Sequence, residues 1–424
     1  MKQIRYIFIL LLFSGRLFAQ DISGDWAGFL SVQGGKLKIV FHIRMNEGKL
    51  STTFDSPDQD AMGLKFEETS LNGNDLLMSS KSLGMQYQGH ANRAVDTISG
   101  LWIQGGGKLP LVVARTTIET VKKPVNPYET DIVLKTPTGE INGTLTMPEQ
   151  SQPVPVVLII AGSGPTDRDG NSPPILKNNS NCYKMLAEAL RKMGIASVRY
   201  DKRGIAGSKA AARKESDLRF ENYVADASAW IALLSLDKRF SKIIVAGHSE
   251  GSLIGMIASG QSVVNGFISI AGSGRPAGEI LKEQFGSLPK DDKDRIYGML
   301  DKLEKGDTIG NVPKELYAFF RPSLQPYMIS WFKYDPAVEI RKLKIPVLLI
   351  QGDMDIQVSL NDAELLAKAN RKASLKIIKN MNHILKDTDT KDKMEQVSKV
   401  YTNPDLPLDK TFEDEVVKFV GQVR

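Results

Sequence analysis

The chain has 424 residues, of which 42% are hydrophobic and 25% charged, a balance that excludes global disorder and fibrous repeats. The formal net charge is +6, but residues 21–424 hold 52 basic against 49 acidic residues, so nucleic-acid binding through the phosphate backbone is not expected. The single cysteine, Cys182, excludes an intramolecular disulfide and a zinc site of several thiolates. With only four histidines, we expect no metal and no cofactor.

The first twenty residues predict an export signal, so residues 1–20 are interpreted as a signal peptide. Lys2 and Arg5 precede the apolar run Tyr6–Phe13, which is too short to span a bilayer, and Ala19 offers a cleavage position. A buried N-terminal strand is the alternative. No later run is long and apolar enough for a membrane span. We therefore expect an exported protein, periplasmic or extracellular, with no span in its mature form.

Residues 21–120 predict a small β domain, either barrel-like or a sandwich, because short alternating runs are separated by turn residues. The segment around Trp26 resembles the segment around Trp102. Either these two strands are neighbours that close a small barrel, or both are simply anchored by a tryptophan. We expect both tryptophans to lie in the core rather than to form a ligand platform. Residues 121–128, with two prolines and two lysines, predict an extended linker.

Residues 129–424 alternate between strand and helix patterns, which predicts an α/β domain with a mostly parallel, eight-stranded sheet covered by helices on both faces. A helical segment at about 275–335 interrupts the alternation, and we expect it to form a lid over the carboxyl ends of the strands. The strands are expected at Ile132–Lys135, Ile141–Met147, Val154–Ala161, Ala196–Tyr200, Lys242–Ala246, Gly266–Ala271, Pro346–Gln351 and Leu375–Lys379. The main helices are expected at Cys182–Met193, Phe220–Leu236, Leu253–Ser259 and Asp362–Asn370.

The segment Gly247–Gly251, Gly-His-Ser-Glu-Gly, predicts a nucleophilic serine at Ser249. A buried strand precedes it and a helix of small residues follows it, so the serine lies on a sharp strand–turn–helix connection. Glycines are needed where the turn leaves no room for side chains, and the helix N-terminus favours negative charge developing at the serine. An ordinary glycine-rich turn is the alternative.

A serine hydroxyl needs a base, and in enzymes with such a turn the acid and the histidine follow the serine in the chain. His383 is the only histidine after Ser249, so it is the candidate base. The loop after the strand Pro346–Gln351 supplies Asp353 and Asp355. We favour Asp355, because Asp353 follows the strand so directly that it suits a turn; the acid would hold the imidazole tautomer.

An oxyanion formed during acyl transfer needs two backbone N–H donors. We expect one from Glu250, directly after the nucleophile, and the other from the loop after the third strand, with Ser163 preferred to Gly164. That loop contains Asp167, Arg168 and Asp169. Together with Arg203 and Glu250 these charged residues form either a polar substrate clamp or a salt-bridge network that fixes the loops, and we favour the network because buried charges must pair.

These motifs together resemble the α/β-hydrolase superfamily of serine hydrolases and, more narrowly, the bacterial EstD-type carboxylesterases. The resemblance is carried by the four segments Gly162–Asn171, Asp201–Gly204, Gly247–Gly251 and Gly352–Val358. It implies hydrolysis of a small-molecule ester through an acyl-enzyme, with Ser249, His383 and Asp355 as the triad. Ala161 departs from the histidine that many esterases have before the oxyanion glycine.

Two other functions fit the sequence. One is an aminopeptidase or dipeptidyl-peptidase-like serine peptidase on the same scaffold, although about 100 residues of β structure are too few for a propeller domain. The other is a catalytically silent binding protein, against which the complete set of serine, histidine and aspartate argues. The sequence gives no oligomeric state.

Overall fold

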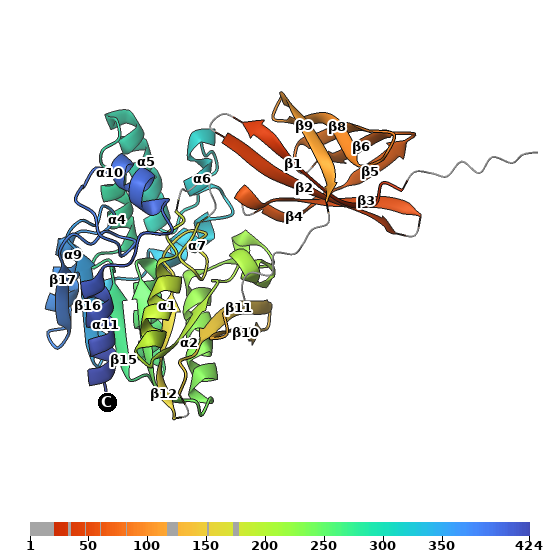
Figure 1. Cartoon of the computed structure of the whole chain (residues 1–424). Helices are drawn as coiled ribbons and strands as arrows, with labels where there is room; N and C mark the ends of the chain where they lie inside the picture. The colour runs from red at the N-terminus through yellow and green to blue at the C-terminus, as the bar shows by residue number, and fades with distance from the viewer. Residues whose placement is uncertain are drawn as a thin grey trace, which may run out of the picture. The chain divides into compact units, whose positions relative to one another are not determined.

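The computed structural model describes residues 21–424 apart from 33–34, 47, 60, 82, 117–125, 151 and 173–177. The expected signal peptide and most of the expected linker therefore lie outside the described residues. The chain divides into two compact units, Met1–Lys123 and Pro124–Arg424, drawn in Figure 1.

The first unit is a nine-stranded antiparallel sheet with the order β4-β3-β2-β1-β9-β8-β7-β6-β5. Along its strands buried and exposed residues alternate, as in Met85–Ala91, because one face of the sheet is turned to the core. Its strands are β1 (Gly24–Val32), β2 (Gly35–Asn46), β3 (Lys49–Ser56), β4 (Ala61–Phe66), β5 (Glu68–Asn72), β6 (Asp75–Ser80), β7 (Met85–Ala91), β8 (Thr97–Gln104) and β9 (Gly107–Thr116), with a short 3₁₀ turn η1 (Pro57–Gln59).

The two edges of this sheet come together. The edge strands β4 and β5 are consecutive in the chain and are separated only by Glu67. In addition, the Thr69 hydroxyl of β5 donates a hydrogen bond to the Thr52 hydroxyl of β3 (3.1 Å). The sheet is therefore curled into a barrel-like shape.

The inside of the curled sheet is an aromatic core. Phe41 lies against Tyr87 with ring centroids 4.9 Å apart, and Phe54 lies edge-on to Trp102 at 5.4 Å. Trp26 and Trp102 are both buried, as expected. The suggestion that their strands are neighbours is wrong, because β9 lies between β1 and β8 and pairs with both.

The second unit is built on an eight-stranded sheet with the order β10-β11-β13-β12-β14-β15-β16-β17. The pairings β10–β11 and β11–β13 are antiparallel and the others are parallel. Its strands are β10 (Glu129–Thr136), β11 (Gly139–Thr146), β12 (Val154–Ile160), β13 (Ala196–Tyr200), β14 (Phe240–His248), β15 (Gly266–Ile270), β16 (Val347–Gly352) and β17 (Ser374–Ile378), within two residues of the predicted boundaries except at the start of β10.

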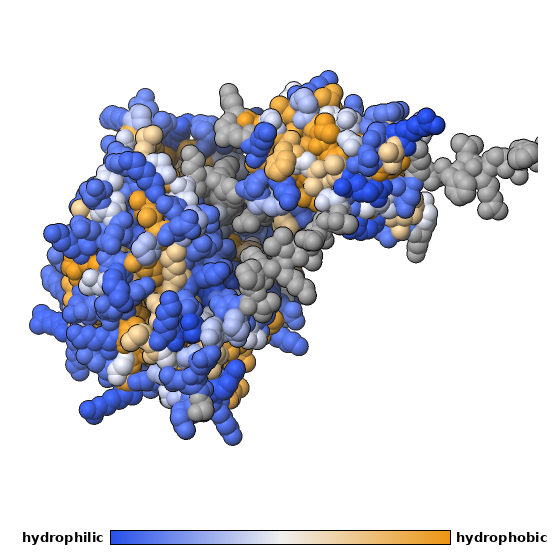
Figure 2. Space-filling view, viewed as in Figure 1, coloured by the Kyte–Doolittle hydropathy of each residue, from blue (hydrophilic) through white to orange (hydrophobic). Residues whose placement is uncertain are grey.

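Helices cover both faces of this sheet, which creates two separate cores. In β12, Val156 and Leu158 face the core under α2, α3 and α8, whereas Val157 and Ile159 face the core under α1 and α11. These helices are α1 (Cys182–Lys192), α2 (Phe220–Ser235), α3 (Glu250–Gln261), α8 (Pro336–Lys342), α9 (Leu360–Ala369) and α11 (Lys410–Gln422). The outward surface of the unit seen in Figure 2 is mostly hydrophilic.

A helical segment separates β15 from β16, where the sequence predicts an insertion. It comprises α4 (Ala277–Gln284), α5 (Lys290–Glu304), η5 (Lys314–Leu316), α6 (Tyr317–Phe320) and α7 (Gln325–Trp331). The remaining short elements are η3 (Ala206–Ala211), η4 (Glu215–Asp217), α10 (Lys393–Gln396) and the π-helical turn η6 (Val397–Tyr401). No described helix is long and apolar enough to cross a membrane.

The helix α3 begins unusually close to the neighbouring strand β12. A Cβ atom added at Gly251 would lie 2.3 Å from the carbonyl oxygen of Ile160, which no side chain can tolerate. Near the other end of the same helix, a Cβ at Gly260 would meet nothing closer than 3.7 Å. Only the first glycine is therefore required by packing.

We predict that Gly251→Ala lowers the free energy of unfolding by about 2–4 kcal/mol, because α3 must move away from β12. The control Gly260→Ala should be neutral or slightly stabilising, because alanine is the better helix former and the site has room. Thermal and urea unfolding of both variants measures the difference, and equal stabilities would contradict the packing argument.

Candidate active site

Ser249 occupies the sharp connection between β14 and α3. Its backbone has φ 54° and ψ −121°, a strained conformation for a residue with a side chain, and its N–H donates to the Ile270 carbonyl (2.9 Å). A Cβ at Gly247 would lie 2.1 Å from the Gly251 carbonyl oxygen, so both glycines of the motif are needed for the turn. This geometry places the serine side chain at the N-terminus of α3, as the motif predicts.

His383 and Asp355 meet, although 28 positions separate them in the chain. The Nδ1 atom of His383 lies 2.8 Å from Oδ2 of Asp355, and these side chains are only 5% and 1% exposed. A carboxylate can only accept, so Nδ1 carries the proton and Nε2 is left as the basic atom. Asp353 is directed elsewhere and accepts a hydrogen bond from the Asn380 N–H (2.6 Å).

Several donors hold the Asp355 carboxylate. It accepts hydrogen bonds from the backbone N–H groups of Gln357 (2.7 Å) and Val358 (3.0 Å) and from the side-chain amide of Gln351 (2.9 Å). Burial acts to raise the pKa of Asp355, but His383 and the two backbone donors outweigh it, so the pKa is lowered. The group is therefore an anion wherever the protein is folded near neutral pH.

Ser249 and His383 line one polar cavity of about 170 Å³, which Ser163 and Gln357 also line. Among the described residues, no hydrogen bond joins the Ser249 hydroxyl to His383. In enzymes without bound substrate such contacts are often loose and tighten only when substrate binds. A second cavity, of about 70 Å³, shares Ser163, Ser249 and Gln357 with the first, so the serine lies where the two cavities meet.

The structure places the two predicted oxyanion donors at this serine. Within the described part of the chain, neither the Ser163 N–H nor the Glu250 N–H has a hydrogen-bond acceptor, and both residues line the 70 Å³ cavity beside Ser249. The Gly162 N–H is not available, because it donates to the Tyr183 hydroxyl (3.1 Å). Gly162 therefore cannot supply a further N–H donor to an oxyanion.

A buried chain of hydrogen bonds behind the serine was not predicted. His248 Nε2 lies 2.8 Å from the His383 carbonyl oxygen, and His248 Nδ1 lies 2.7 Å from the Tyr183 hydroxyl. Since a carbonyl only accepts, Nε2 carries the proton, and Tyr183 must donate to Nδ1. Burial first, and the nearby His383 second, lower the pKa of His248 to about 3. His248 is therefore a neutral support for the His383 backbone.

A buried ion pair also supports the serine loop. Lys202 Nζ lies 2.5 Å from Oε2 of Glu250 and donates to the Gly162 carbonyl (2.6 Å). Tyr327 donates to the other oxygen of Glu250. The Lys202 and Glu250 side chains are 1% and 2% exposed, so this pair links the serine turn to the oxyanion loop without access to solvent. In the sequence, Lys202 stands out only as part of the segment Asp-Lys-Arg-Gly (Asp201–Gly204), and its partner cannot be identified from the sequence.

The predicted polar cluster is divided among several separate pairs. Arg168 pairs with Asp201 (2.7 Å), Asp169 with Arg199 (2.7 Å), and Arg203 with Asp226. Asp167 accepts hydrogen bonds from the backbone N–H groups of Asp169 and Asn171, and burial raises its pKa to about 6. Each of the four residues is thus bonded within the protein, while Glu250 belongs to the Lys202 pair.

The site thus combines a serine in a strained strand–helix turn with a buried histidine–aspartate hydrogen bond, on an α/β-hydrolase fold. Among the described residues, no group of three or more histidine, cysteine or acidic side chains could hold a metal ion. The model of the serine aminopeptidase S33 family matches residues 176–283. The chain is also similar to Esterase EstD of Thermotoga maritima, with 27% identity over 250 residues; the alignment covers 57% of this chain and only 57% of that relative's length.

The chain also matches solved structures at low sequence identity. Est1E from Butyrivibrio proteoclasticus has 17% sequence identity and a TM-score of 0.45, and the match covers 69% of this chain and 99% of that chain. The α/β hydrolase GrgF from Penicillium sp. sh18 has 15% identity and a TM-score of 0.47, over 70% of this chain and 98% of that chain. The family model and the similarity to Esterase EstD agree with the resemblance to α/β-hydrolase serine hydrolases that the motifs predict.

We predict that His248 makes the second unit acid-sensitive. Between pH 6.5 and about 3 the unfolded chain binds a proton at this imidazole that the folded chain does not, so acid favours unfolding. The stabilisation is complete above pH 6.5 and is lost as pH falls through this window, by up to roughly 5 kcal/mol. His248→Gln keeps one donor and one acceptor but cannot titrate, so its unfolding free energy should change less with pH.

Urea unfolding of both proteins at several pH values between about 5 and 7 measures this difference in slope. Asp355 loses its stabilising charge only at lower pH, because its pKa is lowered, and therefore does not contribute there. Parallel pH dependences for the two proteins would contradict the assignment of His248 as a buried neutral imidazole.

Proposed function

We propose that this chain is a serine hydrolase that cleaves carboxylic esters through a triad of Ser249, His383 and Asp355. The observation that carries the proposal is the buried His383–Asp355 hydrogen bond beside a serine held in a strained turn. Backbone strain of this kind costs free energy and is concentrated at active sites, so it supports a functional role for Ser249. The similarity to Esterase EstD favours esters as the substrate class.

In the proposed reaction, His383 Nε2 takes the proton of the Ser249 hydroxyl while the serine oxygen attacks the ester carbonyl. The Ser163 and Glu250 N–H groups would stabilise the oxyanion of the tetrahedral intermediate. His383 then returns the proton to the departing alcohol, which leaves an acyl group on Ser249. Water activated by the same imidazole attacks the acyl-enzyme and releases the acid. Asp355 holds the histidine tautomer throughout.

The smaller cavity beside Ser249 favours a short to medium acyl group. It has a volume of about 70 Å³, and seven of its fourteen lining residues are apolar, among them Leu253, Ile280, Leu281 and Trp331. Arg275 also lines it, but its guanidinium pairs with Asp362 (2.7 Å) and Glu283 (2.6 Å), so its charge is matched within the protein. A small recess with a partly apolar lining and no unmatched charge suits an uncharged chain of few carbons better than a charged group.

A peptidase that removes N-terminal residues is the second candidate, because the matching family model is that of serine aminopeptidases. Such an enzyme needs a carboxylate to bind the substrate ammonium group. Glu250 is the one carboxylate that lines either cavity among the described residues, and it already pairs with Lys202 and Tyr327. The site therefore favours a neutral ester. We also propose that the protein is exported, on the basis of its first twenty residues.

We predict that the purified chain hydrolyses p-nitrophenyl acetate and butyrate but not aminoacyl-p-nitroanilides, and that Ser249→Ala abolishes ester turnover. Ser163→Ala is the control, because it keeps the backbone N–H and should keep most of the activity. A series of acyl chain lengths should peak at the short end. Faster anilide cleavage would instead indicate the peptidase, and no turnover with no fluorophosphonate labelling of Ser249 would indicate a silent binding protein.

We predict that Asp355→Asn lowers kcat on the order of 10⁴-fold, because an amide at this position favours the wrong histidine tautomer. Asp353→Asn, two positions earlier in the same loop, should leave kcat within about a factor of three, since Asp353 bonds to a backbone N–H away from His383. Steady-state kinetics and thermal unfolding of both variants test the assignment. A comparable loss of kcat in the two variants would overturn it.

A further inference from the structure

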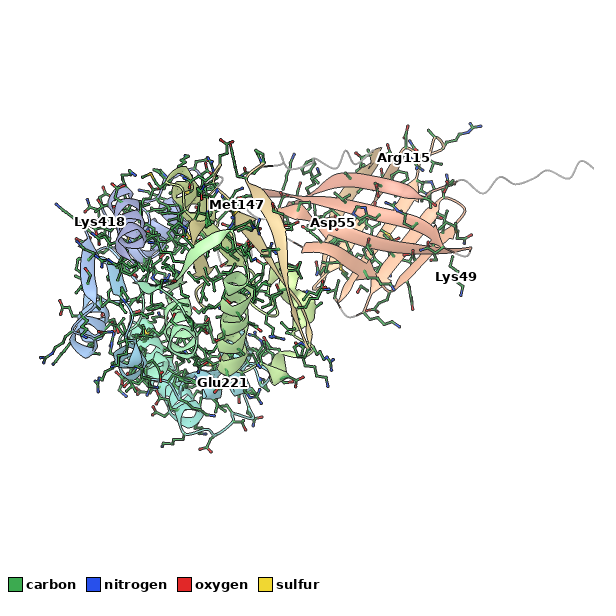
Figure 3. All side chains as sticks on the ribbon, turned by 90° about the horizontal axis from the view of Figure 1, so that it is seen from below. Lys49, Asp55, Arg115, Met147, Glu221 and Lys418 are labelled. Atoms are coloured by element: carbon green, nitrogen blue, oxygen red, sulfur yellow. The ribbon has the colours of Figure 1, made fainter. Side chains whose placement is uncertain are left out.

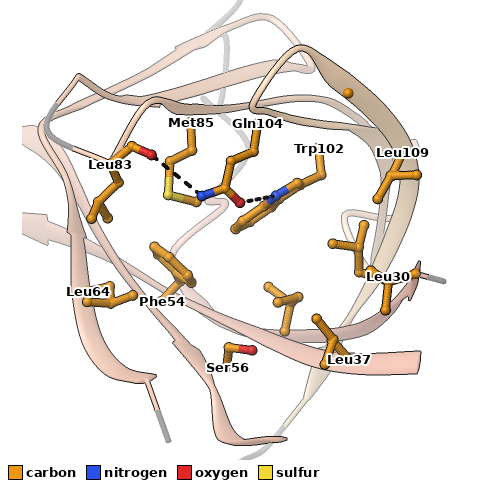
Figure 4. Close-up of a pocket in the computed structure, with 13 residues that line it drawn as sticks. Leu30, Leu37, Phe54, Ser56, Leu64, Leu83, Met85, Trp102, Gln104 and Leu109 are labelled. Carbon is orange, nitrogen blue, oxygen red and sulfur yellow. Dashed lines mark hydrogen bonds between the residues drawn. The ribbon is translucent and has the colours of Figure 1, made fainter. Parts of the chain in front are cut away.

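The first unit contains a cavity of about 330 Å³ that has no role in the proposed reaction. It lies at the end of the curled sheet where the hairpins β1–β2, β6–β7 and β8–β9 turn, and Figure 4 shows side chains from several strands directed into it. Of its thirteen lining residues ten are apolar and none is charged. Leu37, Phe54, Leu64, Met85 and Trp102 are among them.

The opposite end of the curled sheet is closed. Trp26 is completely buried there, and the guanidinium of Arg115 lies 4.6 Å above its ring. The same guanidinium donates to the backbone carbonyls of Ser23 (2.6 Å), Asp21 (2.8 Å) and Val95 (3.0 Å), which ties the chain across this end; Figure 3 labels Arg115 on the first unit. The cavity therefore opens at the hairpin end and is blocked at the other.

A void of this size is unusual, because protein interiors are close-packed and leave few spaces larger than a water molecule. A curled sheet of eight or more strands, however, encloses enough space to hold one small ligand. The one side-chain amide at the cavity is that of Gln104, which accepts from Trp102 Nε1 (3.2 Å) and donates to the Leu83 carbonyl over 3.5 Å. Within the described residues, one N–H of this exposed amide has no acceptor and remains for a ligand.

We propose that the first unit binds one medium-chain fatty acid, with the alkyl chain inside the cavity and the carboxylate at its mouth beside the Gln104 amide. The alkyl chain matches a lining of leucine, methionine and aromatic side chains. The absence of charge in that lining leaves the carboxylate in water, where the open end places it. A sugar is disfavoured, because a lining with two polar side chains would leave most hydroxyl groups unpaired. This proposal does not depend on catalysis by the second unit.

The test uses the full chain carrying Ser249→Ala, with dodecanoic acid as the probe, and measures binding by calorimetry. We expect binding of one molecule, and we expect Leu64→Trp, which fills the cavity, to weaken it about tenfold or more. Leu101→Trp is the matched control. Leu101 directly precedes Trp102 in β8 and is 39% exposed, so this substitution should leave the affinity unchanged. Thermal unfolding of both variants shows whether they are folded.

A second measurement tests the proposal even if the Leu64→Trp variant does not fold. Dodecanoic acid brominated on its chain should quench tryptophan fluorescence, and Trp102→Phe should remove most of this quenching because Trp102 lines the cavity. Absence of binding, equal affinity in Leu64→Trp, or quenching that persists in Trp102→Phe would each overturn the proposal. A ligand bound in the active-site cavity would give the last two results.

Discussion

The close approach of α3 to β12 is the constraint on which the site depends. Because Gly251 presses against the carbonyl of Ile160, the helix begins immediately beside the strand that carries the oxyanion loop. That contact forces the backbone at Ser249 into its positive φ and keeps the helix N-terminus directed at the serine. The backbone strain of one residue is balanced by the packing of two buried elements on the second unit's sheet.

Buried polar groups hold the loops around this turn. The Lys202–Glu250 pair joins the serine turn to the Gly162 carbonyl, and the chain from Tyr183 through His248 reaches the backbone of His383. Each group has a partner, because a buried charge or donor without one would cost more than the pair contributes. The result is rigid support for a nucleophile and base that come from distant parts of the chain, which is what preorganised acyl transfer requires.

The two units bury their sheets in different ways. The second unit buries a mostly parallel sheet under helices on both faces, and the two cavities at its serine have volumes of only about 70 and 170 Å³. The first unit has no described α-helix to cover its sheet, so the sheet curls on itself around an aromatic core. The interior of a curled sheet is filled only where the inward-facing side chains are large enough. Here they leave a cavity at one end of the sheet.

Much of the second unit could be predicted from the sequence. Continuous apolar runs identified its strands, and the turn at Ser249 is encoded by five consecutive residues, because strand, glycine turn and helix are set locally. The choice of His383 followed from elimination. The position of Asp353 directly after the strand already favoured Asp355 as the partner of His383. Tertiary structure alone paired Lys202 with Glu250 and set β9 between the two tryptophan strands. Those outcomes depend on strand register and on segments that meet only after folding, so no local pattern could contain them.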